Sequence, residues 1–381
     1  MDARDFLRGL KRLGVDFYTG VPDSLLKPLN DTLVADCGLT GAHVVAANEG
    51  GAAALAAGHY IATGRPALVY LQNSGIGNAV NPLASLLHPR VYGIPCVFVV
   101  GWRGEPGVPD EPQHAFQGAV TREMLELTGL AVLELERGTG GEAFSDLLTR
   151  AGEALATGRS VAFLAHKGAL TGGEPPRAEA EQPALTREEA LRMILVNADE
   201  ADCFVSTTGK ASREVFALRE ALGQSHDHDF LTVGSMGHAG MIALGMAMAR
   251  PERAFWCLDG DGAALMHLGA LAVEAQQQPM NLIHVLLNNG AHESVGGMPV
   301  AGGQLRFAPI ARAMGYGTVF TAADGDELRL LLPRVRREIS GGPRFLEILL
   351  RQGSRADLGR PTETPRDNLR SLMRTLSGKG E

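Results

Sequence analysis

Residues 254–262 read Ala-Phe-Trp-Cys-Leu-Asp-Gly-Asp-Gly, and residues 282–289 read Leu-Ile-His-Val-Leu-Leu-Asn-Asn. Each stretch is an apolar run that ends in polar residues, which is typical of a buried strand in a parallel sheet. The residues between them leave room for a crossover helix through Ala263 to Gln277, so the two strands are predicted to be parallel neighbours. Asp261 and Asn289 are then expected side by side at the carboxyl ends of these strands.

Oxygen atoms gathered at such an edge suit a magnesium ion. The predicted ligands are the carboxylate of Asp261, the amide oxygen of Asn289 and the backbone carbonyl of Ala291. The glycines at 260 and 262 would let a diphosphate approach the backbone. Because Asp-Gly is also a common turn dipeptide, the prediction depends on the strand-terminal Asn-Asn pair.

Apolar runs alternate with Ala- and Leu-rich helical stretches along the whole chain. Such alternation predicts an α/β protein with two doubly wound parallel-sheet domains. Their predicted bounds are residues 1–171 and 185–352, with a linker at 172–184 and a polar tail at 353–381 that carries one amphipathic helix around 369–376. Thr186 and Glu189 fit a capping box at the first helix of the second domain. The predicted strands are 15–19, 44–47, 66–71, 96–102, 131–135, 161–165, 204–207, 230–233, 254–258, 282–287, 317–321 and 345–350.

Composition narrows the class of partner. The 381 residues include 45% hydrophobic residues and carry a net charge of −8, which indicates a globular protein with no nucleic-acid partner. No apolar run has the ~18 uninterrupted residues of a membrane span, and the first residues lack the pattern of a signal peptide. We therefore expect a cytoplasmic protein with no membrane partner, whose four widely spaced cysteines are idle thiols. Only five of the 35 basic residues are lysines, so an anion site is expected to use arginine.

Several motifs together resemble the thiamine-diphosphate-dependent decarboxylases. They are Gly-Val-Pro-Asp-Ser at 20–24, Asn-Glu-Gly at 48–50, Asn-Ser-Gly-Ile-Gly-Asn at 73–78, the segments 101–107 and 110–114, the Gly-Asp-Gly and Asn-Asn pair, and residues 290–297. The chain is most similar to the phosphonopyruvate decarboxylases, with the sulfopyruvate decarboxylases as near relatives. The resemblance implies a pyrimidine-binding domain followed by a diphosphate-binding domain, with no middle domain. It also implies thiamine diphosphate and Mg²⁺ as cofactors, and a homo-oligomer with active sites at its subunit interface.

Glu49 is the first catalytic candidate. It follows the predicted strand 44–47 and opens a helix from Gly50 to Ala62 that is rich in Ala and Gly. Little water should reach a carboxyl group there, and desolvation raises a carboxyl pKa. The resemblance implies that Glu49 shares a proton with the cofactor's pyrimidine ring and so activates the cofactor. The alternative is a carboxylate that only stabilises the start of its helix.

The resemblance also assigns the remaining cofactor contacts. Met236 would wedge the cofactor into its bent shape, and the Gly234 carbonyl would hold its amino group. Lys210 and Gly240 depart from the family pattern, where an uncharged or aromatic residue and a serine are expected. The full set of cofactor-binding residues that the resemblance implies is Glu49, Gly75, Gly209, Lys210, Ala211, Gly234, Met236, Gly260, Asp261, Gly262, Ala263, Asn289 and Ser294.

Polar residues of the first half are expected around a small anionic 2-oxo acid. Asp23 and His114 are predicted to relay protons or orient the substrate carboxylate, or else to be a turn aspartate and a loop histidine. Arg103 could pair with a distal anion of the substrate, or form a salt bridge to Glu105 or Asp110. Ser24, Asn73 and His292 complete the predicted substrate contacts.

The implied reaction is the decarboxylation of 3-phosphonopyruvate to phosphonoacetaldehyde, an early intermediate of phosphonate natural-product pathways. Sulfopyruvate or another 2-oxo acid is the alternative substrate, and two domains in one chain favour the phosphonate because sulfopyruvate enzymes are often split in two. A nicotinamide-dependent dehydrogenase is a remote alternative, since the glycines at 234, 237 and 240 imitate a dinucleotide fingerprint with the wrong spacing. A non-catalytic cofactor-binding subunit would lack an acid at position 49, where Glu49 is present.

Overall fold

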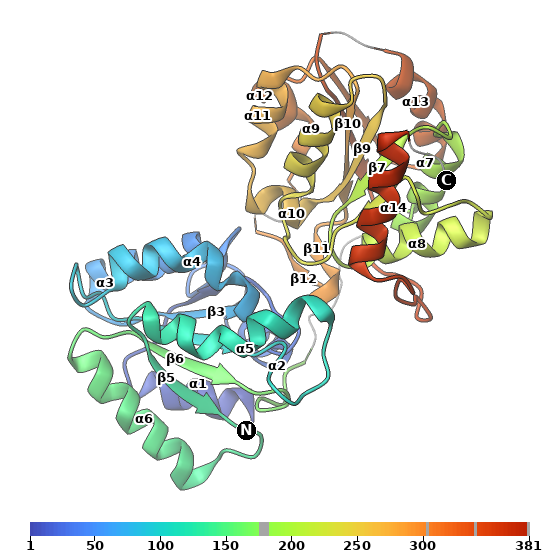
Figure 1. The fold of residues 1–381 in the computed structure, drawn as a ribbon. Coiled ribbons are helices and arrows are strands. Elements are labelled where there is room, and N and C mark those ends of the chain that lie inside the picture. The colour runs from blue at the N-terminus through green and yellow to red at the C-terminus, as the bar shows by residue number, and fades with distance from the viewer. Residues whose placement is uncertain (175–182, 302–304, 339–340, 379–381) are drawn as a thin grey trace. The chain divides into compact units, whose positions relative to one another are not determined.

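The computed structural model describes residues 1–174, 183–301, 305–338 and 341–378. Contacts divide the chain into two compact units, the first formed by Met1–Ala178 with Val295–Ala301 and the second by Glu179–Ser294 with Gly302–Glu381. Each unit contains one six-stranded parallel sheet with helices on both faces (Figure 1). The predicted fold class is confirmed. Residues 175–182, most of the predicted linker, lie outside the described residues.

The sheet of the first unit has the strand order β2-β1-β3-β4-β6-β5. Successive strand residues face opposite sides, so Leu68 and Tyr70 pack on α1, α2 and α6, whereas Val69 and Leu71 pack on α3, α4 and α5. The elements are α1 (Ala3–Lys11), β1 (Tyr18–Gly20), α2 (Lys27–Cys37), β2 (His43–Val45), α3 (Glu49–Thr63), β3 (Leu68–Gln72), η1 (Asn73–Gly75), α4 (Ile76–Pro82), η2 (Leu83–Leu87), β4 (Val97–Gly101), α5 (Pro112–Leu127), β5 (Ala131–Leu135), α6 (Gly141–Ala156) and β6 (Val161–Ala165).

The sheet of the second unit has the strand order β13-β14-β10-β9-β7-β8. One face packs on α7, α8 and α13, and the other on α9, α11, α12 and α14. The elements are α7 (Arg187–Asn197), β7 (Cys203–Ser206), α8 (Lys210–Leu222), β8 (Asp229–Leu231), α9 (Ala239–Ala249), β9 (Phe255–Gly260), α10 (Asp261–Met266), α11 (Ala270–Gln277), β10 (Leu282–Asn288), β11 (Ala291–His292), η3 (Glu293–Val295), β12 (Met298–Pro299), α12 (Phe307–Met314), β13 (Thr318–Ala322), α13 (Gly325–Arg337), β14 (Arg344–Leu349) and α14 (Pro365–Ser377).

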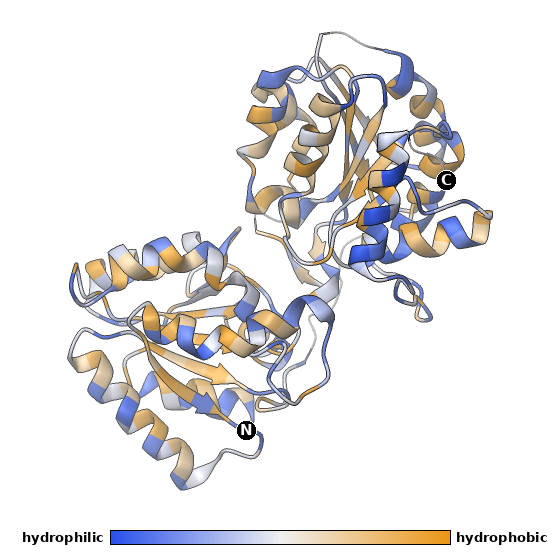
Figure 2. Cartoon of the chain, viewed as in Figure 1, coloured by the Kyte–Doolittle hydropathy of each residue, from blue (hydrophilic) through white to orange (hydrophobic). Residues whose placement is uncertain are grey.

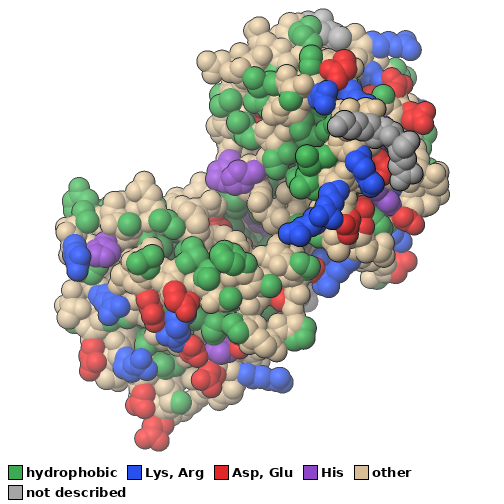
Figure 3. All heavy atoms as spheres, viewed as in Figure 1, with side chains coloured by type: hydrophobic (Ala, Val, Ile, Leu, Met, Phe, Trp, Pro, Cys, Tyr) green, Lys and Arg blue, Asp and Glu red, His purple; other side chains and the backbone are tan. Residues whose placement is uncertain are grey.

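The hydrophobic residues follow this layering. Figure 2 shows hydrophobic colouring along the strands and on the helix sides that face them. On the face drawn in Figure 3, acidic and basic side chains are interspersed on the first unit. No helix within the described residues is long and apolar enough to cross a membrane. The four cysteines are free thiols, and three of them are buried.

Two helix predictions need comment. The capping box at Thr186 and Glu189 is confirmed, with both reciprocal hydrogen bonds present. The single crossover helix predicted through Ala263 to Gln277 is wrong, because α10 ends at Met266 and α11 begins at Ala270. His267 at the break has a non-helical backbone, with φ of −131° and ψ of 50°, so the helix cannot continue through it.

The helix predicted in the tail is confirmed and begins earlier, as α14. It packs on the edge strand β8, where Asn368 is buried. The side-chain amide of Asn368 accepts a hydrogen bond from Leu231 N at 3.1 Å and donates one to Asp229 O at 3.0 Å. One side chain therefore pairs with the backbone of the edge strand in both directions, as a neighbouring strand would.

Candidate active site

The carboxyl edge of the first sheet gathers most of the predicted catalytic residues. The parallel strands β2, β1, β3 and β4 are adjacent in that order. Glu49 follows β2, Asp23 follows β1, Asn73 follows β3 and Arg103 follows β4. Parallel strands end at a common edge, so the topology brings these four residues to one side of the first unit.

The side chain of Glu49 is held in a buried pocket at the start of α3. Only 5% of Glu49 is exposed, and the amide of Asn78 donates to Glu49 Oε2 at 2.8 Å. A Cβ on Gly75 would lie 2.1 Å from Glu49 Oε1, so glycine at 75 makes room for the carboxyl group. Burial raises the pKa of Glu49, and the Asn78 bond only partly offsets this. Glu49 therefore holds a proton more readily than an exposed glutamate does.

Asp23 is a second buried carboxyl group at this edge. It is fully buried, and burial raises its pKa to about 6, although the charge of Arg103 lowers it. Leu25 N donates to Asp23 Oδ2 at 3.2 Å, and Oδ1 has no partner among the described residues. A Cβ on Gly101 would lie 2.0 Å from Asp23 Oδ2. The bond from Leu25, two residues further on, is that of a turn aspartate, and the burial of the carboxyl group also suits a proton relay.

Arg103 is fixed by an acidic partner within its own loop. Its Nε donates to Asp110 Oδ2 at 2.7 Å, its Nη2 pairs with Asp110 Oδ1, and its Nη1 donates to Ser24 Oγ at 3.1 Å. Asn73 is buried and fastens the Arg103 backbone, accepting from Arg103 N at 3.2 Å and donating to Arg103 O at 2.7 Å. The salt bridge that the sequence left open is therefore formed with Asp110. Two of the five guanidinium donors of Arg103 are engaged there.

His114 lies on α5 and not in a proline-rich loop. It is 8% exposed, and its Nδ1 has no partner among the described residues. Burial and the charge of Arg103 both lower the pKa of His114, which favours the neutral ring at neutral pH. A Cβ on Gly104 would lie 1.9 Å from His114 O, and Gly104 has a positive φ of 68°. Glycine is needed there because the loop after β4 touches α5 at this point.

Asp261 and Asn289 are brought together at the edge of the second sheet, as predicted. Asp261 is buried at the start of α10, and burial raises its pKa to about 6. Its Oδ2 accepts from Asn289 N at 3.1 Å and from Gly290 N, which lies 2.6 Å away. Gly262 N donates to Asp261 Oδ1 at 2.7 Å, and Ala291 N donates to Asn289 Oδ1 at 3.1 Å. The loop after β10 is thereby tied to the carboxylate.

The predicted diphosphate loop at Gly209 follows β7, which is the parallel neighbour of β9 and so ends at the same edge as Asp261. Gly209 has a φ of 95°, and a Cβ on it would lie 2.8 Å from Ser294 Oγ. It precedes α8, whose first residues are Lys210 and Ala211. Lys210 Nζ donates to Ser354 Oγ at 2.7 Å, so the unexpected lysine points to the segment after β14. The N-terminus of α8 therefore offers backbone N–H groups to an anion.

The loop that precedes α9 has an unusual backbone. Gly234 and Ser235 both have positive φ values, 70° and 48°, and Met236 follows half-buried. Thr208 Oγ1 accepts from Gly234 N at 3.0 Å. A non-glycine residue at positive φ is uncommon and is often retained at a functional site.

A buried charged network behind Asp261 was missed by the sequence reasoning. His284 Nδ1 lies 2.9 Å from Glu274 Oε2 and its Nε2 lies 3.7 Å from Asp259 Oδ2. Tyr316 donates its hydroxyl to Glu274 Oε2 at 2.6 Å. A Cβ on Gly240 would lie 2.3 Å from Glu274 Oε1, which explains why glycine replaces the expected serine. The only signal was a histidine within an apolar strand.

These groups fit magnesium and a diphosphate. Asp261 and Asn289 supply the oxygen ligands that Mg²⁺ prefers, and the buried carboxylate has no cationic side chain hydrogen-bonded to it among the described residues. The absence of a Cβ on Gly209 lets the Ser294 hydroxyl approach the start of α8, and that hydroxyl is a further donor for a diphosphate. Ala291 is buried and His292 is half-buried on β11. The first unit contains Glu49, Asp23, Asn73, Arg103, Ser24, His114 and Gly75. The other predicted residues lie in the second unit.

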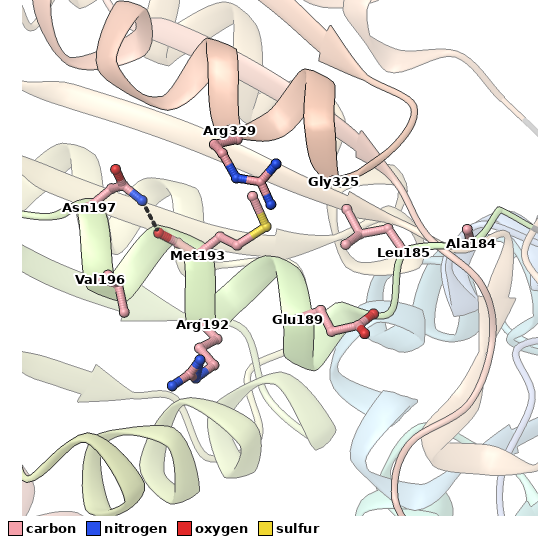
Figure 4. Close-up of a pocket in the computed structure, with 9 residues that line it drawn as sticks. All are labelled: Ala184, Leu185, Glu189, Arg192, Met193, Val196, Asn197, Gly325 and Arg329. Atoms are coloured by element: carbon pink, nitrogen blue, oxygen red, sulfur yellow. Dashed lines mark hydrogen bonds between the residues drawn. The ribbon is translucent and has the colours of Figure 1, made fainter.

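A cavity of about 570 Å³ in the second unit lies away from these residues. Figure 4 shows its lining residues on α7, on α13 and on the segment before α7, with Asn197 Nδ2 bonded to Met193 O at 2.8 Å. None of the predicted site residues lines it, so we assign it no part in the chemistry.

Comparison with known proteins covers both units. Residues 3–125 match the thiamine pyrophosphate enzyme N-terminal TPP binding domain, and residues 207–348 match the C-terminal TPP binding domain. The second match includes the glycines at 234, 237 and 240, which removes the basis of the dinucleotide alternative.

Three relatives match at greater length. A phosphonopyruvate decarboxylase of Streptomyces hygroscopicus is 37% identical, over 96% of this chain and 92% of its own. One from Streptomyces viridochromogenes is 35% identical, over 95% of this chain and 92% of its own. A sulfopyruvate decarboxylase of Methanosarcina acetivorans is 28% identical, over 75% of each chain.

Proposed function

Since the chain belongs to the phosphonopyruvate decarboxylase family of thiamine pyrophosphate enzymes, we propose that it decarboxylates 3-phosphonopyruvate to phosphonoacetaldehyde. The observation that carries the proposal is a likeness to phosphonopyruvate decarboxylases along 95% or more of the chain. The buried carboxyl of Glu49 supports it, because a cofactor-binding protein without catalysis has no need of an acid at that place.

The chain's own residues have separate tasks in this reaction. Thiamine pyrophosphate, when bound, supplies the carbon nucleophile for the substrate carbonyl and takes up the electron pair that CO₂ leaves behind. Glu49 exchanges a proton with the cofactor's pyrimidine ring. Asp261, Asn289 and the Ala291 carbonyl would hold magnesium, and backbone N–H groups around Gly209 and Gly262 would bind the diphosphate.

The carbon that loses CO₂ must gain one proton to become an aldehyde. Asp23 can supply it, because burial raises the pKa of Asp23 to about 6 and keeps part of the group protonated near neutral pH. His114, whose pKa is lowered, can orient the substrate carboxylate as a neutral hydrogen-bond donor. The burial of both side chains limits the water around them.

Sulfopyruvate is the second candidate substrate. The presence of both domains in one chain does not exclude it, because the Methanosarcina sulfopyruvate decarboxylase aligns over 311 positions, more than either unit contains. The preference for the phosphonate therefore rests on the higher identity and coverage of the two Streptomyces relatives.

A direct assay separates these substrates. The purified chain with thiamine pyrophosphate and Mg²⁺ is given phosphonopyruvate, sulfopyruvate or pyruvate, and CO₂ release and the aldehyde product are followed by NMR. We expect the highest kcat/KM with phosphonopyruvate, and none of this activity in Glu49→Gln. A higher kcat/KM with sulfopyruvate or pyruvate would reassign the substrate.

We also propose that the active form is a homo-oligomer, with active sites at its subunit interface, in the cytoplasm. Free thiols at all four cysteines suit a reducing compartment. Co-expressing Glu49→Gln and Asp261→Ala chains tests the shared site. If two subunits build each site, mixed dimers regain one intact site, and about a quarter of the wild-type activity returns. Mixed oligomers without activity would place each site within one chain.

A further inference from the structure

A second cavity lies at the active-site edge of the first unit, beside Arg103. Its volume is about 220 Å³. The loop after β4 lines it together with Ser24 and Leu25 after β1 and Lys167 after β6. Because β4 and β6 are parallel neighbours, with Gly101 opposite Ala165, the residues that follow both strands meet at this point.

The backbone around the cavity is fixed on both sides. Trp102 N donates to Ala165 O at 3.0 Å, and His166 N donates to Leu135 O at 3.1 Å. Ala169 N donates to His166 O at 3.0 Å, which closes a turn through Lys167. The base of the Lys167 side chain is therefore held in place, while its four-carbon chain is free to reach a ligand.

The charged side chains of the cavity differ in whether they already have hydrogen-bond or ion-pair partners. Arg103 is tied to Asp110 and to Ser24. Glu105 Oε1 lies 2.7 Å from His166 Nδ1. Lys167 is exposed, and within the described ranges no hydrogen bond or ion pair engages its ammonium group. A small cavity lined by one fixed guanidinium, one hydroxyl and one uncommitted ammonium suits a small anion.

We propose that Lys167 binds the distal phosphonate of the substrate, with Ser24 and the remaining N–H groups of Arg103 as secondary donors. This inference rests on the proposed function. A compact ammonium with three rotating donors can meet a tetrahedral anion in several orientations, whereas Arg103 has two of its donors turned to Asp110. Lys167 thereby replaces Arg103 as the main candidate for selecting substrates with a second anionic group.

The test compares Lys167→Met with the wild type on two substrates. Phosphonopyruvate carries the distal anion and pyruvate lacks it, so kcat/KM should fall about 10- to 100-fold for phosphonopyruvate and less than about twofold for pyruvate. Lys167→Arg keeps the charge and should recover most of the loss. Lys11→Met is the matched control, because it removes a positive charge from an exposed residue of α1, and it should change neither value.

A binding measurement makes the result independent of turnover. Calorimetry with 3-phosphonopropionate, which has the phosphonate and carboxylate but no keto group, should give a Kd about 10- to 100-fold higher for Lys167→Met than for the wild type. An equal loss on phosphonopyruvate and pyruvate, or an unchanged Kd for 3-phosphonopropionate, would overturn the role of Lys167. A wild type that fails to decarboxylate phosphonopyruvate would instead overturn the proposed function.

Discussion

Replacing Asp23 by asparagine should make the first unit more stable and the enzyme less active. Asp23 is fully buried, its Oδ1 has no partner among the described residues, and its pKa is raised to about 6 from an ordinary 3.8. Asparagine keeps an oxygen for the Leu25 N–H group and carries no charge. The variant therefore removes the cost of a buried carboxylate and leaves the main hydrogen bond in place.

The sign and size of the effect follow from the pKa values. Well below pH 3.8 both the folded and unfolded states hold the proton. Between 3.8 and about 6 the unfolded chain releases it first, so the unfolding free energy falls as the pH rises. Each pKa unit is worth about 1.36 kcal/mol, so the loss reaches about 3 kcal/mol above pH 6. Asp23→Asn should regain up to that amount at pH 7.5 and nothing at pH 3.5.

Urea unfolding can report on the first unit alone. The chain has two tryptophans, Trp102 in the first unit and Trp256 in the second, so a Trp256→Phe background leaves one reporter. Asp146→Asn, at an exposed position of α6, is the control and should lie within about 0.5 kcal/mol of the wild type. A lower unfolding free energy for Asp23→Asn than for the wild type at pH 7.5, or an equal gain in unfolding free energy at pH 3.5 and pH 7.5, would contradict this expectation. Decarboxylation should fall at least ~10²-fold in the same variant if Asp23 supplies the proton.

Three further predictions test the other parts of the site. Glu49→Gln should still bind the cofactor, but hydrogen–deuterium exchange at the cofactor's C2 should slow by at least ~10². Gly75→Ala should have the same effect, because its Cβ would lie 2.1 Å from Glu49 Oε1. Wild-type exchange in either variant would refute the role of the Glu49 pocket. Asp261→Ala should abolish Mg²⁺-dependent cofactor binding and Asn289→Ala should weaken it, and an unchanged affinity by calorimetry would remove Asp261 from the metal site. Gly240→Ser should lower stability by about 1–3 kcal/mol, since its Cβ would lie 2.3 Å from Glu274 Oε1, and an unchanged Tm would contradict this clash.

Patterns that are local in the sequence predicted the framework well. The apolar runs located all twelve strands of the two main sheets within a few residues, because buried parallel strands need continuous apolar stretches. The Gly-Asp-Gly and Asn-Asn pair also placed Asp261 beside Asn289 correctly. The crossover helix was predicted without its break, since nothing in the run from Ala263 to Gln277 marks His267 as non-helical.

Contacts between distant elements could not be predicted in the same way. His284 and Glu274 pair across a strand and a helix, and a sequence shows neither the direction of a side chain nor its burial. The acidic partner of Arg103 was left open for the same reason, because Glu105 and Asp110 are both close in sequence. Lys167 was not among the predicted site residues, because it lines the cavity together with the loop after β4, which lies more than fifty residues earlier in the chain.

The pairing of Asn368 with β8 has a consequence for how the chain is made. Leu231 and Asn368 are 137 residues apart, so a ribosome completes β8 long before it completes α14. Until then the backbone N–H and C=O groups of that edge are open to any extended segment nearby, including one from a second nascent chain. The helix that closes the edge is therefore synthesised after every strand of the two main sheets. A chain that is released early, or trimmed before residue 365, should therefore aggregate by strand addition even though both sheets are complete.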